Sequence, residues 1–310
     1  MFTAVLSSVL PVCLLALLGA ALRQTRFLPE LFFAHLNRLG FWLLLPSLLF
    51  CTIATAPAAA GGAGLRIGLV LCACAVGITL AGWLVARLLR LPEGSARALM
   101  QASMRGNLAY TALPVLLYTF GEGSAEAAAA AMALAPTIPF YNFLAVLVLT
   151  HTDGSTWQAR TARAAGSVLR NPLILGCGLG LLVLKSGIVL PAAGFRAVEA
   201  LGRAALPCAL LALGAGLTPA ALRTRAKPAL AAAALKLLVM PALGYLVARA
   251  AGFSGETMLI TLLYLASPCA VTSYVMADQM GADKELAGSA IALSTLLCLP
   301  VMVVILLLFR

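Results

Sequence analysis

The sequence predicts an all-α protein that crosses a membrane many times, and composition, run length and charge placement all lead to this fold class. The chain of 310 residues is 63% hydrophobic and only 10% charged, whereas soluble domains carry about 25% charged residues. Its apolar residues form long continuous runs rather than the short alternating segments of a membrane β-barrel. Most basic residues lie in the gaps between these runs, so the net charge of +11 indicates membrane topology rather than nucleic-acid binding.

Ten apolar segments are long enough to cross a bilayer, which takes about 20 helical residues. They span residues 3–22, 31–55, 65–88, 96–120, 125–150, 170–189, 195–217, 228–250, 255–279 and 285–309. The connections are short, and the longest one lies in the middle of the chain. We therefore divide the chain into a first five-span repeat at 1–151, a cytoplasmic linker at 152–169 and a second five-span repeat at 170–310.

The distribution of Lys and Arg predicts the orientation. With the N-terminus outside, the inner side (loops and adjoining span ends) holds twelve basic residues and the outer side holds six. Because cytoplasmic loops are enriched in positive charge, both termini are expected on the outer side. The first apolar run is followed, rather than preceded, by Arg23 and Arg26, which argues against a cleaved signal peptide.

An internal repeat links the two halves of the chain. The hexapeptide GWLVAR at 82–87 recurs as GYLVAR at 244–249, an offset of 162 residues. Four further matches lie at offsets of 161 or 162: Pro11 with Pro172, Gly40 with Gly202, Pro46 with Pro207, and Pro139 with Pro300. Because each half has an odd number of spans, a duplicated half must be inverted in the membrane.

The fourth apolar segment contains residues that a membrane helix does not tolerate easily. Arg105 is followed by the helix breakers Gly106-Asn107 and, seven residues after Asn107, by Pro114. A bilayer has no water to satisfy freed backbone groups, so such backbone must line a cavity or be buried in protein. We therefore predict an interrupted helix and a substrate site here.

The ninth segment repeats the pattern at Ser267, Pro268 and Cys269. At an offset of 161, Gly106-Asn107 falls on Ser267-Pro268, so the two breaks are related by the internal repeat. Interrupted helices present positive helix N-termini near the bilayer midplane, and these favour an anionic ligand. An isolated proline kink would carry no such meaning.

Arg105 has two interpretations from the sequence alone. It could bind a substrate carboxylate, or it could snorkel to the inner interface or pair with Asp278. Lys236, in the eighth segment, is interpreted as a structural or coupling residue that bonds a backbone carbonyl or carboxylate of the broken helices. Further candidate lining groups are Tyr110, Thr111, Asn142, Ser273 and Tyr274, for which interhelical hydrogen bonding is an equal alternative.

Other functional classes find little support in the sequence. None of the ten Asp and Glu residues lies at the centre of a span, although Asp278 comes closest. The eight cysteines lie in apolar segments without zinc-type partners and are expected to be free thiols, so no metal and no cofactor is expected. Nucleophile and phosphate-binding motifs are absent, and we expect no enzyme and no catalytic residue.

Several motifs resemble those of the auxin efflux carrier family. RGNLAYTALPVLLYTFG at 105–121 is similar to its fourth span, PFYNFLAV at 139–146 to its fifth, and SPCAVTSYVMADQMG at 267–281 to its ninth. LGFWLLLPSLLF at 39–50 resembles its second span, so the likeness covers the whole chain. The short central linker resembles prokaryotic members, which implies a bacterial inner membrane, with periplasmic or extracellular termini, and puts auxin itself in doubt.

The resemblance implies a fold like those of the bile-acid symporters and sodium/proton antiporters, within the bile-acid/arsenite/riboflavin transporter superfamily. Spans 1, 2, 6 and 7 would form a scaffold domain, often dimeric. Spans 3–5 and 8–10 would form a transport domain in which spans 4 and 9 cross at their breaks and move like an elevator.

The sequence hypothesis is therefore a secondary active or facilitative carrier of a small organic anion, a carboxylate or auxin-like weak acid. The expected partners are this anion, the lipid bilayer and a second copy of the chain, with H⁺ or Na⁺ as an unidentified coupling ion. The alternatives are a cation/proton antiporter on the same fold and a membrane sensor that does not transport.

Overall fold

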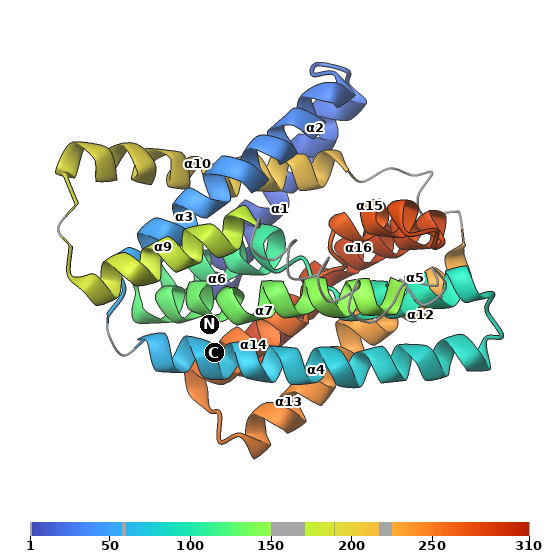
Figure 1. The fold of residues 1–310 in the computed structure, drawn as a ribbon. Helices are drawn as coiled ribbons and strands as arrows, with labels where there is room; N and C mark the ends of the chain where they lie inside the picture. Colours follow the sequence, from blue (N-terminus) through green and yellow to red (C-terminus); the bar gives the residue numbers. More distant parts are fainter. Residues whose placement is uncertain (1, 58–59, 150–170, 189, 217–224, 310) are drawn as a thin grey trace.

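The computed structural model describes residues 2–57, 60–149, 171–188, 190–216 and 225–309, which form helices joined by short turns and irregular segments (Figure 1). The linker predicted at 152–169 lies outside these residues. The first half contains α1 (Phe2–Gln24), α2 (Glu30–Leu39), α3 (Leu45–Ala54), α4 (Ala60–Leu88), α5 (Glu93–Met104), α6 (Leu113–Phe120) and α7 (Ala125–Leu149). The second half contains α9 (Pro172–Ser186), α10 (Ala192–Ala215), α12 (Ala226–Ala234), α13 (Met240–Ala250), α14 (Gly255–Leu265), α15 (Thr272–Gln279) and α16 (Lys284–Phe309).

Within the described residues, six helical stretches are long and apolar enough to cross a membrane: Glu30–Ala54, Gly61–Leu88, Ala125–Leu149, Ala192–Ala215, Ala226–Ala250 and Lys284–Phe309. The other expected spans contain shorter or interrupted apolar helices. Less than half of each long stretch is buried inside the protein. On α4, for example, Leu69 and Leu80 remain 58% and 63% exposed. Apolar surface on this scale suits a lipid environment, and the chain is a multi-pass membrane protein.

In the part of the chain that the structure describes, three short π-helical turns interrupt the helices. Each turn is followed by one further residue and then by a proline. They are η1 (Gly40–Leu44), η2 (Leu108–Ala112) and η3 (Leu235–Val239), which precede Pro46, Pro114 and Pro241. Proline has no N–H, and its ring clashes with the carbonyl four residues earlier in an α-helix. The wider π turn separates these groups and lets the helix continue. Pro114 thus extends the irregular backbone of the fourth segment beyond its break.

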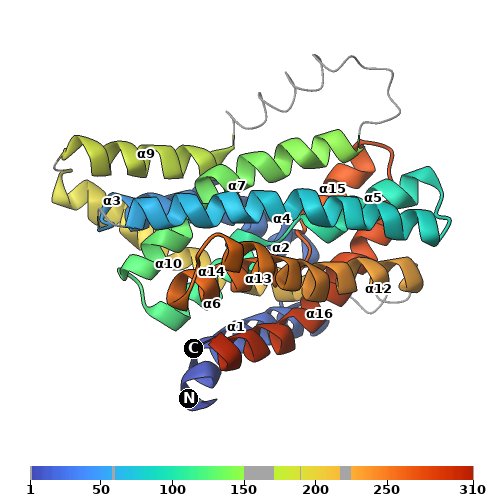
Figure 2. The ribbon, with the colours of Figure 1, turned by 90° about the horizontal axis from the view of Figure 1, so that it is seen from below.

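The helices pack in two groups (Figures 1 and 2). One group contains α1, α2, α3, α9 and α10, and the other gathers around α4, α7 and α16. Glycines allow very close approach within the first group. A Cβ atom on Gly214 would overlap the carbonyl of Ala16, and one on Gly19 would overlap the carbonyl of Leu211, so α1 and α10 touch backbone to backbone.

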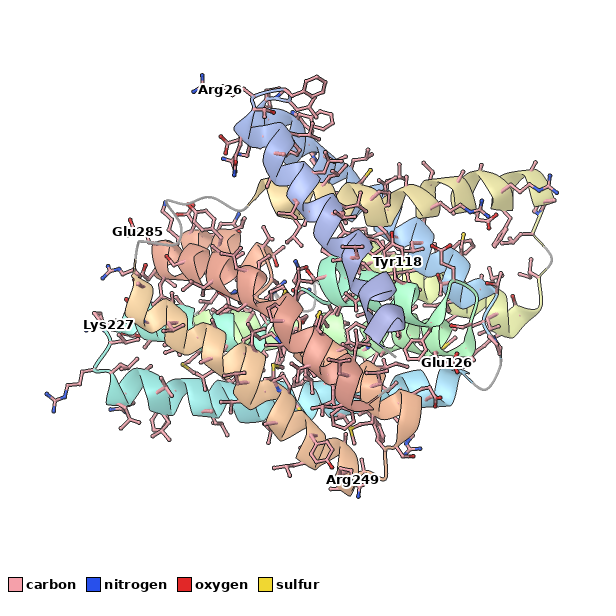
Figure 3. All side chains as sticks on the ribbon, turned by 180° about the vertical axis from the view of Figure 1, so that it is seen from behind. Arg26, Tyr118, Glu126, Lys227, Arg249 and Glu285 are labelled. Atoms are coloured by element: carbon pink, nitrogen blue, oxygen red, sulfur yellow. The ribbon has the colours of Figure 1, made fainter. Side chains whose placement is uncertain are left out.

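Several charged side chains lie near the ends of helices. Arg26 follows α1, Lys227 lies at the start of α12 and Arg249 lies at the end of α13, all at the periphery in Figure 3. The N-terminal part of α1 and the C-terminal part of α16 lie side by side in Figures 1 and 2. Charged residues near helix ends and apolar residues between them match the polar interfaces and the hydrocarbon core of a bilayer.

Candidate functional site

The site is built on two helix interruptions. α5 ends at Met104 and helical structure resumes at Leu108, while α14 ends at Leu265 and α15 begins at Thr272. The sequence predicted breaks at 106–107 and 267–268, and both lie inside the observed gaps. Between the helical pieces the backbone is extended or bent, so several of its N–H and C=O groups have no partner within a helix.

The backbone groups of the two interruptions form hydrogen bonds with each other. The N–H of Asn107 donates to the carbonyl of Pro268 at 2.7 Å, and the N–H of Ala270 donates to the carbonyl of Arg105 at 2.9 Å. These bonds form an antiparallel bridge between Gly106 and Cys269. Irregular backbone is therefore tolerated at this depth because it is paired inside the protein.

The close contact requires glycine at position 106. A Cβ atom there would overlap Oγ of Ser267 and would lie 3.0 Å from Cδ2 of Leu108 and 3.2 Å from Nζ of Lys236. Ser267 is fully buried and its hydroxyl donates to the carbonyl of Tyr264 at 2.6 Å, so it has little room to move. Gly106 thus sets how closely the two segments approach.

Lys236 lies behind the interruptions and is completely buried. Its Nζ donates to the carbonyl of Leu265 at 2.7 Å and contacts Sδ of Met240 at 3.2 Å. Leu265 is the last residue of α14, so the cation faces the negative end of a half-helix. Of the two partners predicted for Lys236, a backbone carbonyl is the one observed.

A cavity of about 620 Å³ lies on one side of the paired interruptions. The first interruption and η2 contribute Arg105, Gly106, Asn107 and Tyr110. The second interruption and the start of α15 contribute Ala270, Val271 and Thr272, and α7 contributes Ile138, Tyr141 and Asn142. Most remaining wall residues come from α2, α10, α15 and α16. The cavity is thus shared between both helix groups and both halves of the chain.

Arg105 is the residue that gives the cavity its charge. Its Nη2 donates to Oδ1 of Asn142 at 2.5 Å, and its Nη1 contacts Sδ of Met276 at 2.8 Å. Both partners are neutral. The predicted alternative of a pair with Asp278 is wrong, because that carboxylate is exposed and bonds Nζ of Lys284 at 2.8 Å. Spacing along the chain could not show whether Asp278 or Asn142 contacts Arg105, since both residues lie on other helices.

Asn107, two residues after Arg105 in the sequence, adds an unused hydrogen-bond donor. Its side chain is only 5% exposed and lines the cavity. Within the described part of the chain, its Nδ2 is buried without a hydrogen-bond partner. A buried amide hydrogen without a partner costs free energy, and an acceptor in the cavity would remove that cost.

The far end of the cavity is lined by an ion pair between Arg23 and Glu30. Nη2 of Arg23 lies 2.6 Å from Oε1 of Glu30, and Nη1 donates to the carbonyl of Ala215 at 2.6 Å. The Glu30 side chain is 78% exposed, so the cavity reaches the surface here. Glu30 is the one carboxylate among the described lining residues, and Arg23 already neutralises it.

Five of the predicted binding residues line this cavity, namely Arg105, Gly106, Asn107, Tyr110 and Asn142. The other five are not among its lining residues: Pro114, Ser267, Pro268, Cys269 and Ser273. Ser267, Cys269 and Ser273 are fully buried in protein. The backbone of these residues pairs the two interruptions or forms the start of α15. The cavity is lined instead by the residues directly after Cys269.

Two lining asparagines were missed from the sequence. Asn37 of α2 accepts a 3.3 Å hydrogen bond from the Tyr110 hydroxyl through its backbone carbonyl. Asn171 caps α9, because its Oδ1 accepts from the N–H of Leu173 at 3.0 Å. Both are amides within or next to apolar segments, and the same reasoning that singled out Asn142 could have found them.

Comparison with known proteins identifies the family. A family model described as membrane transport protein matches residues 4–164 and 161–306, which together cover nearly the whole chain. The chain belongs to this family. The resemblance to auxin efflux carriers seen in the sequence is thereby confirmed.

Two archaeal relatives support membership of this transporter family. An uncharacterized transporter of Methanothermobacter thermautotrophicus is 28% identical over 296 residues, covering 94% of both chains. An uncharacterized transporter of Methanocaldococcus jannaschii is 24% identical over 294 residues, covering 93% of both chains. The similarity therefore extends along the full length of this membrane transport family member rather than over a single motif, and it points to transport rather than enzymatic catalysis.

Proposed function

We propose that this family member carries a small organic anion, such as a carboxylate, and that the cavity beside the interruptions is its substrate site. The observation that carries the proposal is the position of Arg105. Its guanidinium lines the cavity and contacts only neutral atoms among the described residues, Oδ1 of Asn142 and Sδ of Met276. A cation held in this way favours an anionic substrate. Glu30 is the one carboxylate in the described lining, and it is already paired with Arg23.

The proposed architecture has ten spans in two inverted repeats, with α5–α6 and α14–α15 as the two discontinuous spans. The group of α1, α2, α3, α9 and α10 would be the scaffold, through which two copies would form a homodimer. The remaining helices would be the transport domain and would move like an elevator. The internal repeat and the two packing groups support this arrangement. The membrane would be the bacterial inner membrane, with both termini outside, as the basic residues indicate.

A cation/proton antiporter is the alternative on the same fold, and it would need a carboxylate beside the interruptions. Asp278 was the candidate, but its side chain is 51% exposed and it pairs with Lys284. We therefore expect Asp278→Asn to keep transport. Loss of all activity in this variant, with Arg105→Ala still active, would favour the antiporter.

The test is uptake into proteoliposomes that contain the purified full-length protein. A panel of radiolabelled mono- and dicarboxylates is offered, with and without an imposed H⁺ or Na⁺ gradient, so that the coupling ion is read in the same assay. We expect saturable uptake of at least one carboxylate above that of empty liposomes. Movement of cations without any carboxylate would refute the proposal. Binding of a carboxylate without flux would indicate a sensor instead.

A further inference from the structure

A second cavity lies away from the candidate substrate site, where α4 ends, α5 begins and α7 ends. Its volume is about 800 Å³. Among the described residues, its lining contains three arginines, Arg87, Arg90 and Arg97, and a single acidic residue, Glu93. These described side chains carry a surplus of two positive charges, and none of them lines the cavity at Arg105.

Two of the arginines, Arg87 and Arg97, are held in place by groups of the protein. The guanidinium of Arg87 lies over the ring of Trp83, 5.1 Å from its centroid. Nη1 of Arg97 donates to the carbonyl of Leu149, the last residue of α7, at 2.6 Å. Arg87 and Arg90 are exposed and form no ion pair with any residue of the described ranges. Their charges are thus available to an external anion.

The end of α4 beside this cavity has the composition of a membrane boundary. The apolar stretch Gly61–Leu88 has a mean hydropathy of 2.3 and ends beside Arg87 and Arg90. Trp83 is 47% exposed and Leu88 is 73% exposed at this end of α4. An exposed Trp and arginines at the end of a membrane-length apolar helix mark the boundary between the acyl chains and the headgroups.

The walls of the cavity combine this charge with apolar surface. Leu91, Met100 and Leu147 line it together with the arginines. A small soluble anion would use the cations but would leave these apolar walls in contact with water. A phospholipid would use both, since its phosphate meets the arginines while its glycerol and upper acyl chains meet the apolar side chains.

We propose that this cavity binds the phosphate headgroup of an acidic phospholipid of the surrounding bilayer. Arg87 and Arg90 would contact the phosphate and the negative headgroup, and Trp83 would hold Arg87 in position. This inference does not depend on which substrate the protein carries, because the two cavities have separate linings. Phosphatidylglycerol is the probe, since it has a net negative charge, whereas phosphatidylcholine has none.

The test measures lipid retention and thermal unfolding of the purified full-length protein. Native mass spectrometry counts bound phosphatidylglycerol against phosphatidylcholine, and the apparent unfolding temperature is recorded with each lipid. We expect preferential retention of phosphatidylglycerol and a higher unfolding temperature with it. In the double variant Arg87→Gln/Arg90→Gln, we expect the preference to fall about 25-fold, at about fivefold for each arginine.

The matched control is Arg196→Gln/Arg249→Gln, which removes two exposed arginines outside the cavity. It should keep the preference for phosphatidylglycerol. Equal unfolding temperatures of all three proteins in phosphatidylcholine would show that the variants fold. An unchanged preference in Arg87→Gln/Arg90→Gln, or an equal loss in the control, would overturn the proposal. If soluble glycerol phosphate reproduced the whole thermal effect, the ligand would be a free phosphate and the lipid assignment would be wrong.

Discussion

Nη2 of Arg105 donates a 2.5 Å hydrogen bond to Oδ1 of Asn142, and this contact joins the first interruption to α7. Asn142 fixes one edge of the guanidinium and leaves its positive charge in place. A carboxylate at the same position would neutralise that charge. A charge-assisted hydrogen bond to a neutral amide is strong enough to orient the side chain. The arginine can therefore be positioned and still be available to an anion in the cavity.

Asn142→Asp tests this arrangement with almost no change in shape. The new carboxylate would pair with Arg105 and neutralise it. We expect thermal stability to be kept or raised, while anion uptake falls by about 100-fold because the substrate must displace an internal ion pair. Gln279→Glu is the control, since it makes the same amide-to-acid change at an exposed position of α15. Normal uptake by Asn142→Asp would contradict the assigned role of the charge.

Arg105 variants separate charge from geometry. Arg105→Ala removes both and should reduce anion uptake by about 100-fold or more, which is the usual scale for losing one partner of a desolvated charge pair. Arg105→Lys keeps the charge but cannot contact Asn142 and Met276 with two separate nitrogens of a planar group, so we expect intermediate uptake.

The control for this series is Arg203→Ala, which removes a 68% exposed arginine that pairs with Glu199 on α10. Uptake and the apparent unfolding temperature are measured for all variants. If Arg105→Ala transported a carboxylate as well as Arg203→Ala does, the substrate would not be recognised through this guanidinium.

Gly106 and Ser267 should be energetically coupled. Gly106→Ala places a Cβ atom against Oγ of Ser267, so it should lower the free energy of unfolding by about 1–3 kcal/mol, the usual cost of overpacking. Ser267→Gly removes the atom that is hit, although it also loses the bond to the Tyr264 carbonyl. We expect the double variant to be more stable than the sum of the single effects predicts. Strict additivity would show that the contact with Ser267 is not the reason for glycine.

The interruptions could be located from the sequence because glycine, proline and a charge stand out in an apolar run. Gly106-Asn107 and Ser267-Pro268 both lie within the observed gaps between helices. What the sequence did not predict is which side of each gap faces the cavity. Helical periodicity can assign residues to faces only where the backbone is regular. The prediction therefore named Ser267 and its neighbours as binding residues, whereas the cavity is lined by the residues that follow them.

Contacts between separate helices were harder to predict than the helices themselves. A pair with Asp278 was one of the alternatives considered for Arg105, but the fold places Asn142 and Met276 against it. Asn142 is 37 positions from Arg105 in the chain and on another helix. The carbonyl partner of Lys236 was foreseen for a different reason, since a buried lysine without a nearby acid must find an acceptor of some kind.

Lys236 is expected to stabilise the fold rather than to bind substrate. It is fully buried, is not among the lining residues of the cavity at Arg105, and donates to the last carbonyl of α14. Lys236→Met keeps an unbranched side chain of similar shape, one heavy atom shorter, but leaves the Leu265 carbonyl without this donor. We expect the free energy of unfolding to fall by about 1–3 kcal/mol, the cost of an unsatisfied buried acceptor.

Lys227→Met is the matched control for this change, because Lys227 is exposed at the start of the same span. It should unfold like the unmodified protein. Uptake per folded molecule should persist in Lys236→Met at a temperature where the variant remains folded, because Arg105 and Asn142 are unchanged. A variant with full stability but no uptake would instead place Lys236 in the transport step itself, and the carbonyl of Leu265 would then have to find another donor when the lysine is absent.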